Sequence, residues 1–212
     1  MVVTTGERTD RRREMLELLQ RLHRHKDAAY GDAWRKRGEV IAIFANMARK
    51  YDRLLVAFDE QTPAATEPLG DTVADLCVYS GKYLTWIADE HPTAIAGGVS
   101  LEASRISAAR GPDALADLFA AVLTDPTEPP IDARTAWDRT QASFHTLERG
   151  LMAQATPESV EPVPSYAAKA RLAWTLVQDT LWLLLALEAE APGALDGLRA
   201  EVSRMDEAAR TS

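Results

Sequence analysis

The sequence predicts an all-α protein built as a helical bundle, and three observations support this fold class. Apolar residues recur at spacings of three and four along most of the 212 residues, which is the period of one face of an amphipathic helix. The sustained alternation of apolar and polar residues that marks a half-buried strand is absent. Prolines and glycines interrupt the pattern at intervals, so they divide the chain into several helices.

The first part of the chain contains three long segments with helical periodicity. We expect these helices over residues 10–26, 38–58 and 68–89. Between the first two, Gly31 permits a turn and Asp32 can cap the following helix through its carboxylate. A Pro-containing loop at 61–68 separates the second helix from the third. His91-Pro92 is expected to end the third helix.

The second part of the chain predicts further helices separated by glycine and proline. Gly97-Gly98 is expected to be flexible, and Ser100 can cap the helix that follows it. The later helices are expected at 101–106, 113–122, 132–154, 165–190 and 194–209. The proline-rich stretch 125–130 is the best candidate boundary inside the chain, and a second proline-rich loop lies at 157–164.

The composition is that of a globular protein, with 46% hydrophobic and 26% charged residues. The formal net charge of -8 argues against a nucleic-acid polymer as the partner, because phosphate backbones require a basic surface. No run of 18 apolar residues occurs, so we expect no membrane association. The N-terminus lacks the apolar stretch of a secretory signal, and the expected location is the cytoplasm.

Cysteine and histidine give no indication of a metal or nucleophile site. Cys77 is the only cysteine, which excludes an internal disulfide and argues against a zinc site. It lies within an apolar helical segment, where we expect a buried and inert thiol. His23 and His25 point to different faces of their helix and have no partner at metal-ligand spacing, so both are expected at the surface.

The strongest candidate site is a polar seam on two helices. On a helical wheel Glu39 lies close to one line with Asn46, Lys50 and Arg53. On the next helix Asp71 and Asp75 stand one turn apart, with Lys82 on the same side. Carboxylates on adjacent helices could hold Mg²⁺ while basic groups contact a phosphate. The alternative is a solvated face or an interhelical network of salt bridges.

Two aromatic residues flank the predicted turn after the first helix. Tyr30 and Trp34 could close the core or stack on a planar ligand. Composition alone favours closure of the core. The motif context described next gives the ligand equal weight.

Three motifs resemble the small MazG-like proteins of the all-α nucleotide pyrophosphohydrolase superfamily, in the branch associated with nucleotide modification. The motifs are Lys26-x-x-x-Tyr30-Gly31-Asp32-Ala33-Trp34, Arg49-Lys50-x-x-Arg53-Leu54 and Asp71-Thr72-x-x-Asp75-Leu76-x-x-Tyr79. The resemblance covers roughly residues 10–90. It implies a MazG-like helical region at 10–95 that contains the site, and additional helices at 100–212 that complete the bundle or form an oligomer interface.

The resemblance also implies an activity and a set of site residues. Such proteins form dimers or tetramers and split a nucleoside triphosphate into monophosphate and pyrophosphate with Mg²⁺. The catalytic and metal-binding residues would be Glu39, Asp71 and Asp75. The substrate-binding residues would be Lys26, Tyr30, Trp34, Asn46, Lys50, Arg53 and Lys82.

Two positions depart from the family pattern of paired acidic motifs. Ala42 occupies the place of the second glutamate of the first motif, and the acids of the next helix are spaced Asp71-x-x-x-Asp75 with Thr72 between them. These departures fit either a divergent site completed by Asn46 or a non-catalytic protein. The non-catalytic alternative is a helical nucleotide sensor or an oligomeric interaction module.

Overall fold

The computed structural model describes residues 5–59, 69–99, 101–124, 132–155 and 164–211, and these contain helices but no strand. The all-α class is therefore confirmed for the described residues. In chain order the helices are α1 Thr5–Tyr30, η1 Gly31–Trp34, η2 Glu39–Phe44, α2 Ala45–Asp59, α3 Leu69–Glu90, α4 Pro92–Val99, α5 Ala103–Ile106, η3 Ala108–Arg110, α6 Pro112–Thr124, α7 Ala133–Ala155, α8 Tyr166–Glu190 and α9 Asp196–Thr211. The predicted loops at 61–68, 125–130 and 157–163 and the Ser100 cap lie outside the described residues.

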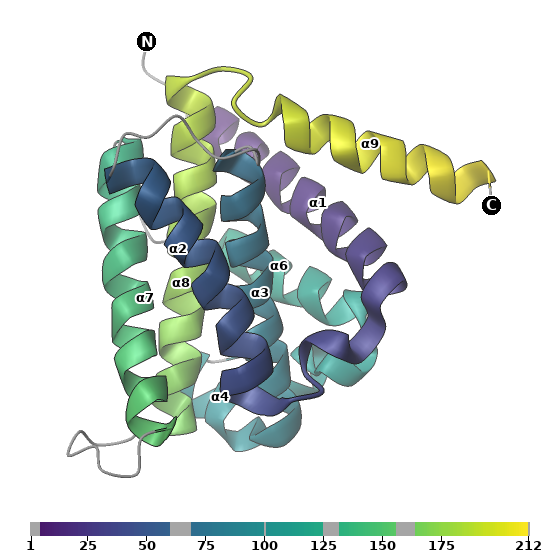
Figure 1. The fold of residues 1–212 in the computed structure, drawn as a ribbon. Helices are drawn as coiled ribbons and strands as arrows, with labels where there is room; N and C mark the ends of the chain where they lie inside the picture. The colour runs from purple at the N-terminus through teal and green to yellow at the C-terminus, as the bar shows by residue number, and fades with distance from the viewer. Residues whose placement is uncertain (1–4, 60–68, 100, 125–131, 156–163, 212) are drawn as a thin grey trace.

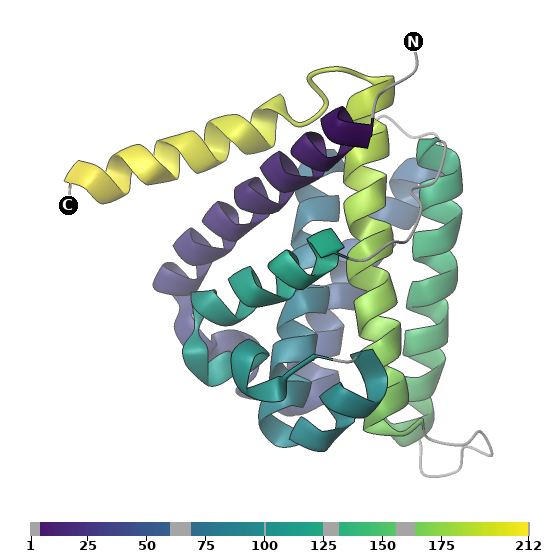
Figure 2. The ribbon, with the colours of Figure 1, turned by 180° about the vertical axis from the view of Figure 1, so that it is seen from behind.

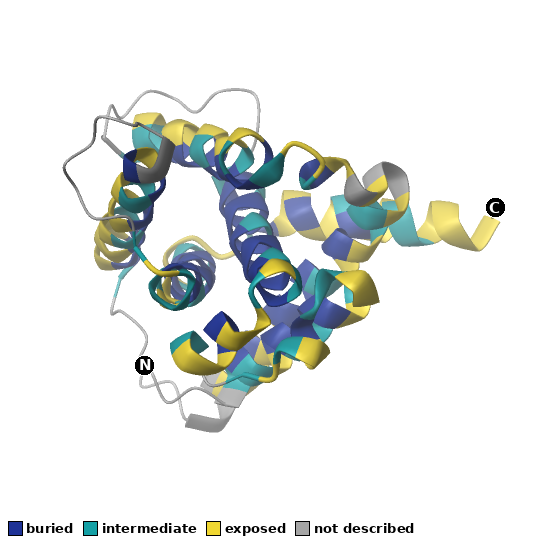
Figure 3. Cartoon of the chain, turned by 90° about the horizontal axis from the view of Figure 1, so that it is seen from below, coloured by how far each residue is buried: buried dark blue, intermediate teal, exposed yellow. Residues whose placement is uncertain are grey.

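The body of the protein is a bundle in which α8 lies between α3 and α7, with α2 crossing in front (Figure 1). On the opposite side of the bundle, α6 packs beside α1 (Figure 2). Viewed from below, buried residues follow the inner faces of the helices (Figure 3). Helix α9 packs on α1 and projects away from the bundle.

Aromatic stacking holds α2 against α7. The rings of Tyr51 and Phe144 are stacked with centroids 3.9 Å apart, and Phe58 stacks on Trp137 at 4.7 Å. Such pairs add to the hydrophobic gain from burial alone. The contact keeps α2 in place, and α2 is one of the helices that carries the polar seam.

Helix α8 contributes a long apolar segment to the core. It is the one described helix long and apolar enough to cross a membrane, but 61% of that stretch is buried inside the protein. A buried core helix has the same length and composition, so this is weak evidence for a membrane. Cys77 of α3 is fully buried against this helix, and burial raises the pKa of its thiol to about 12.

The expectation that Gly97-Gly98 is flexible was wrong, because both glycines lie within α4. A Cβ atom on Gly98 would be 2.6 Å from the carbonyl oxygen of Ala167 in α8. The absent side chain lets the two helices approach closely. Gly98 therefore serves packing, and the chain after α3 continues as a short helix.

The predicted helix at 38–58 begins with a π-helical segment, η2, before it becomes the α-helix α2. A π-helix bonds residue i to i+5, so one turn holds more residues than an α-helical turn. Glu39 is therefore rotated away from the line expected on an α-helical wheel. Gly38, with φ of +79°, starts the segment.

Candidate ligand pocket

A pocket of about 390 Å³ lies where α1, η1, α2 and α3 meet. The described residues that line it are His23, Lys26, Ala33, Trp34, Asn46, Arg49, Lys50, Asp75, Val78, Tyr79 and Lys82. Its volume is in the range typical of small-molecule sites. All of these residues precede position 83, so the described lining of the pocket comes from the first helices.

Helical spacing explains why these side chains converge. His23 and Lys26 are three residues apart on α1, and Asn46 and Lys50 are four apart on α2. Residues at these spacings share a helix face. The turn after α1 requires Gly31, whose φ of +50° favours glycine, and it returns the chain so that Trp34 closes the pocket.

Five of the seven predicted substrate-binding residues line this one pocket. They are Lys26, Trp34, Asn46, Lys50 and Lys82. Arg53 is exposed on α2 and does not line the pocket. The side chains of Tyr30 and Asp32 lie outside the described residues.

Asp75 is the carboxylate in the pocket wall, and each of its oxygens is paired with a lysine. Oδ1 lies 2.5 Å from Lys26 Nζ, and Oδ2 lies 2.6 Å from Lys50 Nζ. Lys50 and Asp75 are both buried, each with 7% of the residue exposed. Burial alone would lower the pKa of Lys26, but the Asp75 carboxylate outweighs it and raises that pKa. Lys26 is therefore charged in the folded protein.

Lys82 lies beside both a carboxylate and an aromatic ring. Its ammonium is 3.5 Å from Asp27 Oδ1 and 5.1 Å from the centroid of the Trp34 ring. A cation over an indole face is stabilised electrostatically. Trp34 is buried in the core, with 9% exposed, and its indole also lines the pocket. It therefore closes the core, while stacking on a planar ligand stays a prediction.

Asn46 is held by its own helix. Its side-chain Nδ2 donates to the carbonyl of Ala42 at 2.8 Å, and its Oδ1 accepts from Arg49 at 3.0 Å. The amide is therefore oriented at the pocket wall by two local hydrogen bonds. Its oxygen is engaged by a cation, which does not suit the predicted support of a metal ion.

His23 is buried, contrary to the expectation that it lies at the surface. It is 3% exposed and faces the pocket beside Lys82. Burial, followed by the charges of Lys82 and Arg24, lowers its pKa to about 3. Its Nδ1 has no hydrogen-bond partner among the described residues. His23 therefore contributes a neutral ring to the pocket.

The structure does not bring Glu39 together with Asp75, and this corrects the predicted cluster of three acids. Both oxygens of Glu39 lie 3.0 Å from Lys169 Nζ of α8. Tyr83 also donates to Glu39, and Tyr166 donates to it at 3.4 Å. Burial, and then the Glu39 charge, raises the pKa of Tyr83. Glu39 therefore belongs to a buried network that ties η2 to α8.

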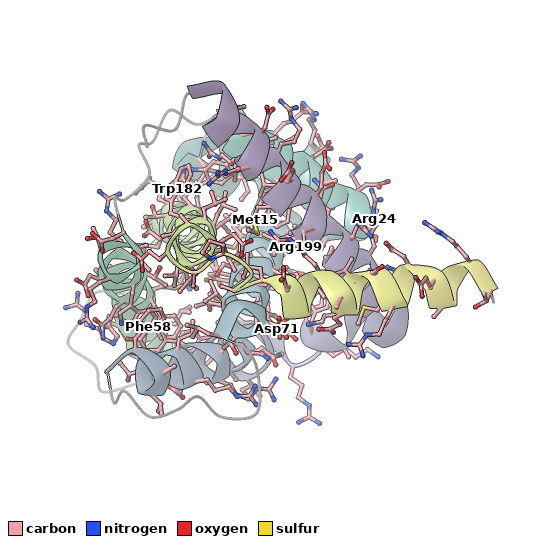
Figure 4. The ribbon with its side chains drawn as sticks, turned by 90° about the horizontal axis from the view of Figure 1, so that it is seen from above. Met15, Arg24, Phe58, Asp71, Trp182 and Arg199 are labelled. Carbon is pink, nitrogen blue, oxygen red and sulfur yellow. The ribbon has the colours of Figure 1, made fainter. Side chains whose placement is uncertain are left out.

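Asp71 also lies apart from the pocket. It is in the first turn of α3, at the end of the bundle near α9 (Figure 4). The adjacent Gly70 packs closely against Leu195, which precedes α9. Asp71 does not line the pocket, although it is one turn from Asp75.

These positions do not suit a magnesium ion held by three carboxylates. Among the residues that the structure describes, no group of three His, Cys, Asp or Glu side chains could hold a metal. Glu39 and Asp75 each direct both oxygens at lysine ammonium groups. A cation at either place would have to displace a buried ion pair.

Three charged or titratable residues in the pocket and in the buried Glu39 network were not predicted from the sequence. His23 could have been found from its spacing of three from Lys26 on the first helix. Asp27, next to Lys26, shares no helix with its partner Lys82 and gave no signal. Lys169 stands near the start of a strongly apolar helix, and a lone lysine there could have indicated a buried ion pair.

A larger cavity, of about 770 Å³, lies where α1, the end of α8 and the start of α9 meet. Met15 and Arg199 mark its place in Figure 4. Its charged lining residues are Arg11, Arg21, Arg199, Glu14, Glu17 and Glu188. These charges balance, and no aromatic residue is among its described lining. It therefore lacks the chemical selectivity of the smaller pocket.

Comparison with protein-family models, curated proteins and solved structures gave no match for this chain. The function must therefore be inferred from the chemistry of the pocket.

Proposed function

We propose that the chain binds a nucleotide in the pocket between α1, η1, α2 and α3, and that it does so as a helical protein of the MazG-like type. The observation that carries the proposal is the meeting of several lysines with one buried indole in a single cavity. A nucleotide combines a flat aromatic base with a polyanionic phosphate group. The indole of Trp34 suits the base, and the lysines suit the phosphate group.

Charge favours a phosphate ligand. Lys26, Arg49, Lys50 and Lys82 are the cationic lining residues. Asp75 in the wall, Asp27 beside Lys82 and Glu201, whose charge acts on Lys26, are the carboxylates near them among the described residues. The four cations therefore exceed these three carboxylates by one. Because the neighbourhood is largely buried, this surplus acts on a ligand more strongly than it would in water.

The flat wall favours an aromatic group next to the phosphate. Trp34 presents an indole that already attracts the Lys82 ammonium. Stacking of a base on an aromatic side chain contributes about 1–3 kcal/mol. The neutral ring of His23 lies on the same side of the pocket and offers a further polar contact.

The binding experiment is calorimetric titration with adenosine, AMP and ATP, with and without Mg²⁺. We expect ATP to bind at least about tenfold more tightly than adenosine, because the phosphates meet the lysines. Equal affinity for the nucleoside and the triphosphate, or no binding of either, would contradict the proposal.

Two substitutions on α2 form a matched pair for this experiment. Lys50→Gln removes a charge from the pocket, and we expect it to weaken ATP binding by about tenfold or more. Arg53→Gln removes a charge from the exposed side of the same helix, and we expect a change within about twofold. Circular dichroism checks that both variants keep their helices. An equal effect of both substitutions would indicate non-specific attraction to the helix.

The same incubation with Mg²⁺ tests hydrolysis, which remains a prediction of the family resemblance. Separation of the products by ion exchange would reveal monophosphate and pyrophosphate if the chain is a pyrophosphohydrolase. The geometry favours the binding module, because two of the three carboxylates predicted for catalysis, Glu39 and Asp75, are engaged by lysines. Intact ATP after prolonged incubation is therefore the expected result.

A further inference from the structure

Asp75 occupies the most cationic place in the pocket. Its carboxylate lies between the ammonium groups of Lys26 and Lys50, at 2.5 and 2.6 Å. The Asp75 side chain is 10% exposed, and so the pairs are shielded from water. In the free protein, the Asp75 carboxylate is therefore the anion that pairs with these two lysines.

An anionic ligand would meet the same lysines. If its phosphate approaches Lys26 and Lys50, it also approaches the negative charge of Asp75. Two like charges a few ångströms apart in a partly buried site repel strongly. The ligand must therefore bind the lysines more strongly than the carboxylate does. A phosphate can do so because it carries more charge and more acceptor oxygens.

The two lysines differ in their freedom to respond. Lys50 has 9% of its side chain exposed, whereas Lys26 has 31% exposed and lies near the end of α1. A partly exposed lysine has rotamers that reach into solvent. Lys26 is therefore the partner that can turn from Asp75 to a ligand, and Lys50 is the partner that keeps Asp75 neutralised.

We propose that Asp75 is an internal counter-ion that competes with the phosphate of the ligand for Lys26, and that it thereby sets the minimum charge a ligand must carry. This inference rests on the proposed nucleotide binding and assigns to Asp75 a role opposite to that of a metal ligand. The pocket discriminates by charge: a ligand with few charges does not displace the carboxylate, and a polyphosphate does.

The test is the affinity of Asp75→Asn for ATP and AMP, measured by calorimetry in EDTA so that no divalent cation takes part. Asparagine keeps the size of the side chain and removes its charge. We expect ATP to bind about tenfold more tightly than to the wild-type chain, and AMP to gain no more than ATP does, because the carboxylate repels the less charged ligand less. Unchanged or weaker ATP binding in this variant would overturn the inference.

A second pair of variants covers the case in which Asp75→Asn fails to fold, since it leaves two lysines without their anion. Lys26→Met weakens ATP binding by removing one cation. Adding Asp75→Asn in that background leaves Lys50 alone, with the same net charge as the wild-type trio. We expect the double variant to bind ATP more tightly than Lys26→Met. Equal or weaker binding would overturn the inference.

The outcomes separate this inference from the function on which it rests. If the wild-type chain binds ATP and neither Asp75→Asn nor the double variant gains affinity, the counter-ion role alone fails. If none of the chains binds ATP, the proposed function fails and the counter-ion role fails with it. If Mg²⁺ strengthens ATP binding to the wild-type chain and Asp75→Asn abolishes that effect, Asp75 is a metal ligand and the inference is overturned.

Discussion

His23 is a titratable residue that folding removes from water. It is 3% exposed and lies near Lys82 and Arg24. Burial disfavours its charged form, and the two cations disfavour it further. The folded protein therefore holds His23 neutral under conditions in which the unfolded chain takes up a proton.

This neutral histidine predicts a loss of stability in mild acid. The pKa of His23 is lowered from 6.5 to about 3 on folding. Its contribution to the free energy of unfolding is fully present above pH 6.5 and is lost as the pH falls from there towards about 3. We expect this residue to cost about 2 kcal/mol on going from about pH 7 to about pH 5.

Urea unfolding of the wild type and of His23→Gln at the two pH values measures the effect. Glutamine cannot take up the proton, so the variant should lose about 2 kcal/mol less than the wild type over the same interval. Carboxylates titrate in both proteins and cancel in the comparison. Equal losses would show that His23 does not stay neutral on folding.

At the scale of the elements, the contact between α4 and α8 depends on one of two adjacent glycines. A Cβ on Gly98 would lie 2.6 Å from the Ala167 carbonyl oxygen and 2.9 Å from Ala170 Cβ. A Cβ on Gly97 would lie 3.8 Å from Ala167 Cβ, which is ordinary contact. Position 98 therefore requires glycine, whereas position 97 has room for a methyl group, although the two glycines are adjacent in the sequence.

Alanine at each position provides a matched comparison. Gly98→Ala should destabilise the protein by about 1–3 kcal/mol, because α4 and α8 must separate. Gly97→Ala should be neutral or stabilise it by up to about 1 kcal/mol, because alanine is the better helix former. Thermal unfolding of both variants distinguishes the two effects. A similar change in both would mean that helix propensity alone decides the outcome.

The long helices were predictable from periodicity, but the short α4 was missed, and the relative rotation and contacts of the helices could not be predicted. A helical wheel assumes one period, and the π-helical η2 breaks it at Glu39. The wheel therefore predicted Glu39 beside Lys50, whereas the structure pairs it with Lys169. Glycine pairs are also ambiguous, since flexibility and close packing both require the absence of a side chain.

The candidate site was predictable where it depended on spacing within one helix. Asn46 with Lys50 and Asp75 with Lys82 share helix faces, and all four line the pocket. Contacts between helices could not be predicted from the sequence. For this reason the pairing of Asp75 with Lys26, across 49 residues, was missed.

At the scale of the whole molecule, the two parts of the chain contribute differently to the pocket. The described residues that line it run from His23 to Lys82. The later helices α7 and α8 pack behind it, and Lys169 of α8 anchors η2 through Glu39. The second part of the chain thus supports the helices that carry the pocket.

The distribution of lysines allows one direct measurement of the central claim, that the pocket binds a nucleotide through its lysines. The chain contains only five lysines, at positions 26, 36, 50, 82 and 169. Three line the pocket, Lys36 is exposed outside it, and Lys169 is buried with Glu39. Carbon-13 labelling of the lysine side chains gives an NMR signal for each, assigned by single substitutions. On titration with ATP we predict that the signals of Lys26, Lys50 and Lys82 shift and that those of Lys36 and Lys169 do not. The account would be contradicted if the signals of the three pocket lysines did not shift, or if the signal of Lys36 shifted most.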